Sequence, residues 1–302
     1  MSTDSADEAD VPPAFREYGE QTLPHSPAFG HGKDGVCDLT LVRRPDGETR
    51  LLRDFVRVPY HLPGTLDTDP IEGLTTLCLQ EPTGGIAQGD RHSLSVEARR
   101  RSRCRITTQS ASKVHSMHAN YAHLDATLSA ESGAFLEYLP GPTIVNEDAR
   151  CLQTVSVDSA DDAVVVVSDV LVPDGLTDHE PFTFDHYHSR FEARIDGELV
   201  CADTVDIEPA KRDPRNPATV GEYGVVGTLY VLAPAEDAGA LADRLHERVA
   251  AADAVRGGAS TLSAESGVAV RVLGHRSTDV VEAIDAAVAE IRSAVLDEEG
   301  DT

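Results

Sequence analysis

Apolar and polar residues alternate with a period of two along most of the chain, from about Val36 to Val231. The alternation is clearest at Ser93–Ala98, at Leu124–Ser129 and at Phe191–Asp196. Successive side chains of a β-strand point to opposite faces of its sheet, so this pattern predicts strands with one buried face. The region therefore predicts a large body built of strands.

Two local patterns add detail to this strand-rich region. Asp196-Gly197 lies between two alternating segments and predicts a tight hairpin that leads into a strand at Leu199–Val205. Val164–Val167 is an unbroken run of β-branched residues. Such a run predicts a strand that is buried on both faces.

The hydrophobic period lengthens towards 3.6 residues in the C-terminal region. A helix is predicted to begin near Pro234 and to be stopped by Gly257-Gly258, and a second helix is predicted to begin at Thr278. A short strand at Val268–Val272 separates them. Two helices after many strands predict a mainly β protein, in the range from all-β to α+β, with two C-terminal helices. The apolar stripes are Leu241, Leu245 and Val249 in the first helix, and Val281, Ile284, Val288, Ile291 and Val295 in the second.

Residues 1–32 differ from the rest because they are rich in Asp, Glu, Pro and Gly and have no sustained apolar period. They predict a mobile acidic N-terminal tail, and residues 33–300 predict a single domain. The first ten residues lack the features of a secretory signal. The longest apolar run, Ala163–Val167, is far shorter than the roughly 20 residues that span a bilayer. We therefore expect a cytoplasmic protein.

The charge balance narrows the classes of partner. The chain has 52 acidic and 26 basic residues, a net charge of -26, and three lysines among the basic residues. Nucleic acids and anionic membranes are poor partners for such a molecule. We interpret the acidity as adaptation to a halophilic cell, where salt near 1 M shortens the Debye length to about 3 Å. The alternative is an acidic surface that gathers cations such as Ni²⁺, but the charge is spread along the whole chain.

Three motifs follow one another in the central region: GGIAQGD (Gly84–Asp90), ITTQSASKVH (Ile106–His115) and LEYLPGPTI (Leu136–Ile144). The first predicts a glycine turn with positive φ, because a strand rather than a phosphate-binding helix follows it. The hydroxyl and amide groups of the second predict either a polar ladder across strands or a hydrated passage or contact surface. In the third, Glu137 either satisfies backbone donors at a turn or lines a route for a metal.

Histidines provide the candidate metal ligands. His186 and His188 are two residues apart and would face one side of a strand, and His179 lies shortly before them. Imidazole and carboxylate groups suit nickel. The alternative is a polar loop that holds solvated histidines. The five cysteines are odd in number and form no C-x-x-C pair, so neither a disulfide framework nor a zinc knuckle is predicted.

In this order and spacing, the three motifs resemble the urease accessory protein UreD family, called UreH in some lineages. The resemblance extends to Gly227-Thr228-Leu229, to Gly267–Gly274 (GVAVRVLG) and to the final helix, and it covers roughly residues 36–296. It implies a mainly β fold that is partly β-helical, with a two-layer sheet body and appended helices.

The resemblance also implies a function. Family members are non-enzymatic chaperones that bind UreF, and through it the GTPase UreG, and dock on apo-urease to assist nickel insertion. The resemblance implies an internal tunnel through this subunit as the favoured route for nickel, with no tightly bound cofactor and at most transient binding of Ni²⁺. The positions that match the motifs, and are therefore candidates for tunnel or partner contact, are Gly84, Gly85, Gly89, Asp90, Thr107, Thr108, Gln109, Lys113, Glu137 and Pro140.

Two alternative functions stay open at this point. One is a metal-dependent enzyme on a β scaffold that uses His179, His186 and His188, with an open coordination position and a general base. The other is a structural adaptor that recruits partners and never contacts nickel.

Overall fold

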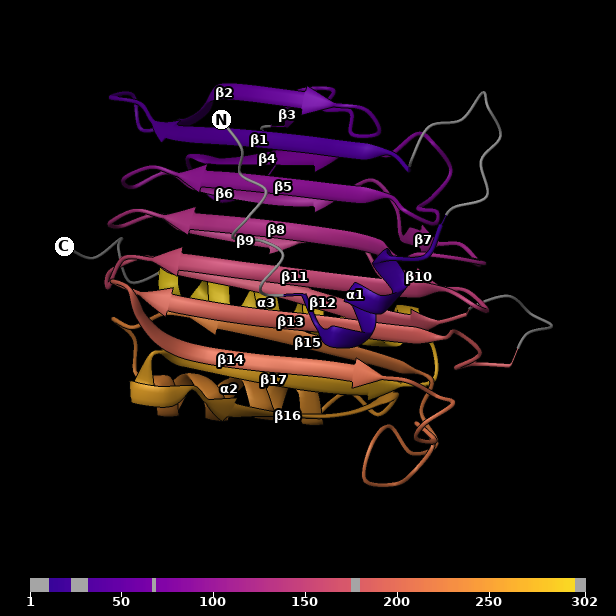
Figure 1. Ribbon diagram of the computed structural model, residues 1–302. Helices are drawn as coiled ribbons and strands as arrows, with labels where there is room; N and C mark the ends of the chain where they lie inside the picture. Colours follow the sequence, from indigo (N-terminus) through magenta and orange to yellow (C-terminus); the bar gives the residue numbers. More distant parts are fainter. Residues whose placement is uncertain (1–10, 23–31, 67–68, 175–179, 297–302) are drawn as a thin grey trace.

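Two stacked β-sheets form the body of the protein, and in Figure 1 the seven-stranded sheet lies in front of the ten-stranded one. The computed structural model describes residues 11–22, 32–66, 69–174 and 180–296. The front sheet has the strand order β14 (Glu198–Ile207), β13 (His186–Ile195), β11 (Arg150–Ser159), β8 (Ala122–Ala130), β5 (Arg91–Ala98), β1 (Asp34–Arg43) and β2 (Thr49–Arg57).

The second sheet lies behind the first and also carries the helices. Its path is β16 (Val255–Thr261), β17 (Gly267–Gly274), β15 (Val225–Leu232), β12 (Val164–Pro173), β9 (Phe135–Leu139), β6 (Arg103–Thr108), β4 (Leu74–Leu79) and β3 (Thr65–Leu66). Off this path, β10 (Thr143–Val145) pairs with β12 and with β7 (Ser112–Val114).

Between β4 and β13 the longer strands of the chain alternate between the two sheets. Up to β11, each such strand pairs in parallel with the equivalent strand of the next turn, as β5 does with β8 and β6 with β9. This is the geometry of a β-helix with two faces, which confirms the predicted mainly β, partly β-helical fold. From β13 onward the pairing becomes antiparallel, beginning with the hairpin at Asp196-Gly197.

The alternating pattern of the strands fills the space between the sheets. Leu94, Val96 and Ala98 of β5 point inward, as do Phe191 and Ala193 of β13, and all are buried. Val165 and Val167 face this same core, whereas Val166 faces the helices. The prediction that Val164–Val167 lies in a strand buried on both faces is therefore confirmed.

Helices α2 (Ala238–Ala250) and α3 (Ser277–Leu296) cover the outer face of the ten-stranded sheet, as Figure 1 shows. The predicted apolar stripes pack against this sheet, where all their members are buried except Val281 and Val295, which are partly buried. The side chain of Asp237 caps α2 by accepting a hydrogen bond from the backbone N–H of Ala240 at 3.0 Å. No helix in the described parts of the chain is long and apolar enough to cross a membrane.

Gly257-Gly258 does not end the first of these helices, which corrects the sequence prediction. The helix ends at Ala250, and both glycines lie within strand β16. A Cβ atom on Gly257 would lie 2.4 Å from a methyl carbon of Val249. The glycine therefore allows α2 to pack closely against the strand. Close packing, and not the end of a helix, is the reason for a glycine at this position.

A short helix, α1 (Pro13–Gly19), lies on the outer face of the seven-stranded sheet. Phe15 is fully buried there and packs on Tyr121 and Leu152. The expectation of a mobile segment is wrong for this helix, because the side chain of Phe15 anchors it to the sheet. A single aromatic residue has no periodicity, so the hydrophobic pattern did not predict the helix. The division into a tail and one domain otherwise stays a prediction.

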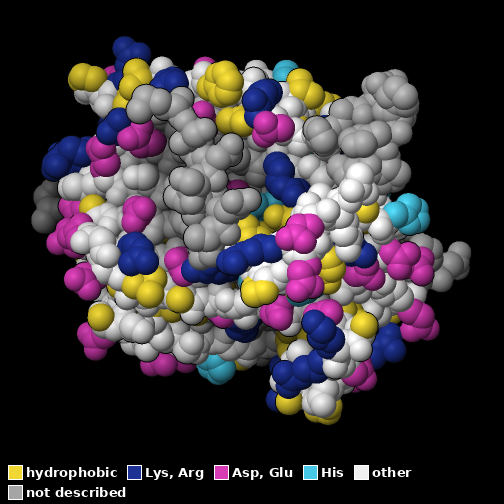
Figure 2. Space-filling view, viewed as in Figure 1, with side chains coloured by type: hydrophobic (Ala, Val, Ile, Leu, Met, Phe, Trp, Pro, Cys, Tyr) yellow, Lys and Arg dark blue, Asp and Glu magenta, His cyan; other side chains and the backbone are white. Residues whose placement is uncertain are grey.

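Charged side chains of both signs are interspersed over the front face in Figure 2. This distribution fits a surface adapted to salt better than a single acidic field that collects cations. All five cysteines are free thiols, and Cys37, Cys104 and Cys151 are buried. Burial raises the pKa of the Cys37 thiol to about 12, so this group stays protonated at neutral pH.

Candidate functional site

Two adjoining cavities open where β4, β6 and β7 end or begin. The wider has a volume of about 170 Å³ and is lined by the glycine turn and by residues 108–113. The narrower has a volume of about 50 Å³ and reaches between the sheets, where Tyr138 faces it from one sheet and Gln153 from the other. The residues that line both cavities are Leu79, Glu81, Thr108 and Ser112.

Glu81, which lines both cavities, pairs with the imidazole of His92, which lines neither of them. His92 Nδ1 is 3.1 Å from Glu81 Oε1, and the His92 side chain is 1% exposed. The tautomer that donates from Nδ1 leaves Nε2 as an acceptor, and Nε2 makes no hydrogen bond to a described residue. An imidazole oriented by a carboxylate in this way has the form of a metal-binding histidine.

Polar groups continue between the sheets beyond the narrower cavity. The Thr143 hydroxyl lies 3.5 Å from Gln153 Oε1, and the Asp169 carboxylate accepts hydrogen bonds from Ser189 at 3.0 Å and Tyr187 at 3.2 Å. Burial raises the pKa of Asp169, although these hydrogen bonds oppose the rise. The second motif therefore borders a line of polar groups that runs into an otherwise apolar core.

The glycine motif forms the turn that the sequence predicts. Gly84, Gly85 and Gly89 have φ values of +84°, +136° and +77°. Asp90 is buried, accepts hydrogen bonds from the backbone N–H groups of Lys33 at 2.6 Å and Ala87 at 2.8 Å, and pairs with the Lys33 ammonium at 3.1 Å. Asp90 thus holds the turn in place at the edge of the wider cavity.

Replacing Gly85 with alanine is expected to destabilise this turn by about 1–3 kcal/mol. The new Cβ would lie 2.8 Å from the Lys113 carbonyl oxygen and 2.4 Å from His115 Nε2, at a φ that side chains rarely adopt. Gly84→Ala is the matched control, because its Cβ would meet nothing within 4 Å. Urea unfolding at constant high salt measures both variants, and equal losses would contradict this account of Gly85.

The structure brings six of the ten motif positions to the cavities. Gly89 and Asp90 belong to the supporting turn instead, whereas Thr107 and Glu137 face the helices on the other side of the ten-stranded sheet. Five of the six line the wider cavity: Gly84, Gly85, Thr108, Gln109 and Lys113. The sixth, Pro140, lines the narrower cavity, which Thr108 also lines.

Glu137 anchors α3 and does not line the cavities. Its fully buried carboxylate receives two hydrogen bonds of 2.6 Å from Arg292, whose guanidinium also lies 3.1 Å from Asp69. The Thr107 hydroxyl donates to the Leu139 carbonyl at 2.8 Å. Both positions therefore support the fold next to the cavities, and neither the backbone turn nor the metal route considered for Glu137 is observed.

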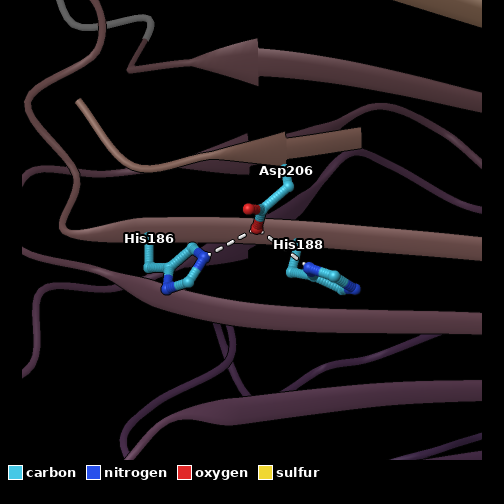
Figure 3. Close-up of side chains that lie close together, drawn as sticks. All are labelled: His186, His188 and Asp206. Atoms are coloured by element: carbon cyan, nitrogen blue, oxygen red, sulfur yellow. Dashed lines mark hydrogen bonds and ion pairs between the residues drawn. The ribbon is translucent and has the colours of Figure 1, made fainter. Parts of the chain in front are cut away.

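A separate cluster lies on the outer face of the seven-stranded sheet. His186 and His188 point to the same side of β13, as predicted, and both contact Asp206 of β14 (Figure 3). The distances to Asp206 Oδ1 are 2.8 Å from His186 Nε2 and 2.9 Å from His188 Nδ1. Burial raises the pKa of Asp206, but the hydrogen bonds from the two imidazoles outweigh it and lower the pKa below its ordinary value.

Of the remaining histidines that the structure describes, none joins this cluster. His179 lies outside the described residues, so its proposed role as a ligand stays a prediction, and so does the alternative of a metal-dependent enzyme. His115 Nε2 is 3.0 Å from the Gly84 carbonyl, and His123 Nε2 is 3.0 Å from the Thr154 hydroxyl. Burial and the nearby Arg91 lower the pKa of His123 to about 4, so its imidazole is neutral at pH 7.

Comparison with known proteins decides the family. The family model described as UreD urease accessory protein matches residues 33–301. The chain belongs to the UreD family. It is 67% identical to the urease accessory protein UreD of Natronomonas pharaonis over 91% of this chain and 92% of that protein. It is 60% identical to the UreD of Haloquadratum walsbyi, over 98% of this chain and 97% of that protein.

These findings confirm the resemblance in the sequence. A third relative, the UreD of Haloarcula marismortui, is 44% identical over 96% of each chain. The relatives are from halophilic archaea, which fits the interpretation of the acidic, lysine-poor composition. As a member of the UreD family, the protein has a role in urease maturation.

Proposed function

We propose that this UreD-family protein acts as the scaffold on which nickel is delivered to apo-urease, together with UreF and, through UreF, UreG. The protein turns over no substrate of its own and binds Ni²⁺ in passing. The observation that carries the proposal is the pair of adjoining cavities, because they share four lining residues and the narrower one reaches between the sheets.

The chemistry of the junction supports transit of a divalent cation. Glu81 supplies a carboxylate to both cavities, and the buried imidazole of His92, which lines neither cavity, lies 3.1 Å from that carboxylate. Carboxylate and imidazole are ligands that nickel accepts. One carboxylate holds a cation less tightly than the three or four ligands of a structural metal site, which suits a cation that has to leave again.

The lining of the wider cavity also supports transfer of a cation from the surface opening towards Glu81. Hydroxyl and amide groups from residues 108–112 replace part of the hydration shell of an entering ion, whereas Lys113 places a positive charge at the opening. Of the residues that line both cavities, only Glu81 has a carboxylate, so Glu81 is the favoured position for the cation.

Co-purification tests the scaffold role. The tagged chain, co-expressed at high salt with its cognate UreF, UreG and apo-urease subunits, should retain all three. Retention of UreG should require UreF. Failure to retain either UreF or apo-urease would remove the scaffold role.

A further inference from the structure

We propose that His186, His188 and Asp206 form a binding site for one borderline divalent cation such as Ni²⁺ or Zn²⁺, on the outer face of the seven-stranded sheet. The site does not rest on the proposed route for nickel. Even-numbered residues of β13 face outward and odd-numbered residues face the core, where Tyr187 and Ser189 contact Asp169. The cluster and the cavities therefore lie on opposite faces of this sheet.

The spacing of the donor atoms favours a cation. A tetrahedral centre with ligands at about 2.0–2.2 Å separates neighbouring donor atoms by about 3.3–3.6 Å. Here the two imidazole nitrogens lie 2.8 and 2.9 Å from one oxygen of Asp206, and all three donor atoms lie within 4.8 Å of one another. Small rotations of three side chains are sufficient to surround an ion.

The surroundings supply the support that a bound cation requires. His186 Nδ1, which carries the proton when Nε2 binds a metal, lies 3.5 Å from the Tyr18 hydroxyl of α1. The Phe15 ring packs 4.6 Å from the His186 ring, measured between centroids. These contacts hold the imidazole in one orientation, because helix α1 covers it.

The cluster is also accessible from one side. The side chains of His186 and His188 are 4% and 12% exposed, whereas that of Asp206 is 56% exposed. An ion can therefore enter at the carboxylate and keep a water molecule or another ligand in its fourth position. Two imidazoles and one carboxylate select Ni²⁺, Co²⁺ or Zn²⁺ over Mg²⁺ and Ca²⁺, which prefer oxygen ligands.

Equilibrium dialysis against Ni²⁺ and, separately, Zn²⁺ tests the site in the full chain at high salt. Asp206→Asn and His188→Ala should each bind one equivalent fewer than the unaltered protein. Asp206→Asn keeps the shape of the side chain, so it guards against loss of folding, which circular dichroism checks for both variants. His246→Ala is the matched control, because it removes an exposed histidine from α2 on the far side of the molecule.

A spectroscopic readout makes the result specific to these residues. In spectra that detect the imidazole nitrogens, Zn²⁺ should shift Nε2 of His186 and Nδ1 of His188 in the unaltered protein and leave His246 unchanged. Equal stoichiometry and affinity in the unaltered protein and in Asp206→Asn would overturn the site. So would the absence of any shift at His186 and His188, because the cluster would then be a hydrogen-bonded network alone.

Discussion

Ser112→Phe is expected to lower urease activation to the level seen without this chain, while the complex with UreF, UreG and apo-urease still forms. Ser112 lines both cavities, and the narrower one has a volume of only about 50 Å³. A phenyl ring placed there closes the connection between the surface opening and the space between the sheets. Urease activity after incubation with Ni²⁺ measures the effect, and co-purification measures assembly.

The control for this variant is Ser110→Phe. Ser110 is exposed at the edge of the wider cavity and does not line the narrower one, so the same change in size leaves the connection open. It should activate urease as the unaltered protein does. Normal activation by a folded Ser112→Phe protein would show that nickel does not travel between the sheets, and would leave the scaffold role standing.

Arg292→Ala is expected to reduce the free energy of unfolding by about 3–5 kcal/mol, the largest effect on stability among the predictions made here. The substitution leaves the Glu137 carboxylate fully buried without its two hydrogen bonds of 2.6 Å, and it removes the partner of Asp69. Urea unfolding at constant salt gives the value. Helix α3 should detach first, because this pair ties it to β9.

Two further variants test whether the buried ion pair causes this loss of stability. Arg276→Ala removes another arginine of the α3 region that pairs with a carboxylate, but at an exposed position, so it should change stability little. The double variant Arg292→Met with Glu137→Met removes the buried Glu137 carboxylate together with its partner, so it should recover the part of the loss that comes from this carboxylate. If Arg292→Ala lost no more than Arg276→Ala, the buried pair would not be what holds α3 in place.

The strands were predictable from the sequence because each has one buried face and a period of two. The alternation at Ser93–Ala98 and Phe191–Asp196 led directly to β5 and β13, and the order of the motifs led to the family. The inward and outward directions also followed from this period. His186 and His188 were expected on one face and are found there.

Asp206 could not be found in the same way, because its position depends on a β-bulge. A regular two-residue hairpin at Asp196-Gly197 pairs Ile195 with Glu198, and the same register carried along the strands would set Val205 opposite His188. The irregularity at Ala193/Arg194 shifts the register by one residue and sets Asp206 opposite His188 instead. No feature of the local sequence announces this shift.

Long-range pairs were missed for a related reason. Glu137 and Arg292 are 155 residues apart, and neither position carries a local signal of its partner. The pattern at Leu136–Tyr138 did predict the direction of the Glu137 side chain. Glu137 lies between two core residues of one strand and must therefore face away from the core. The two roles considered for Glu137, at a backbone turn or along a route for a metal, followed from the motif and overlooked this alternation.

The most direct test of the proposed function is in vitro activation of purified apo-urease by UreF, UreG, GTP and Ni²⁺ at high salt, with and without this chain. Urease activity and the nickel content of re-isolated urease are measured together. The account predicts that both rise only when the chain is present. Equal activity and equal nickel content without the chain would contradict it.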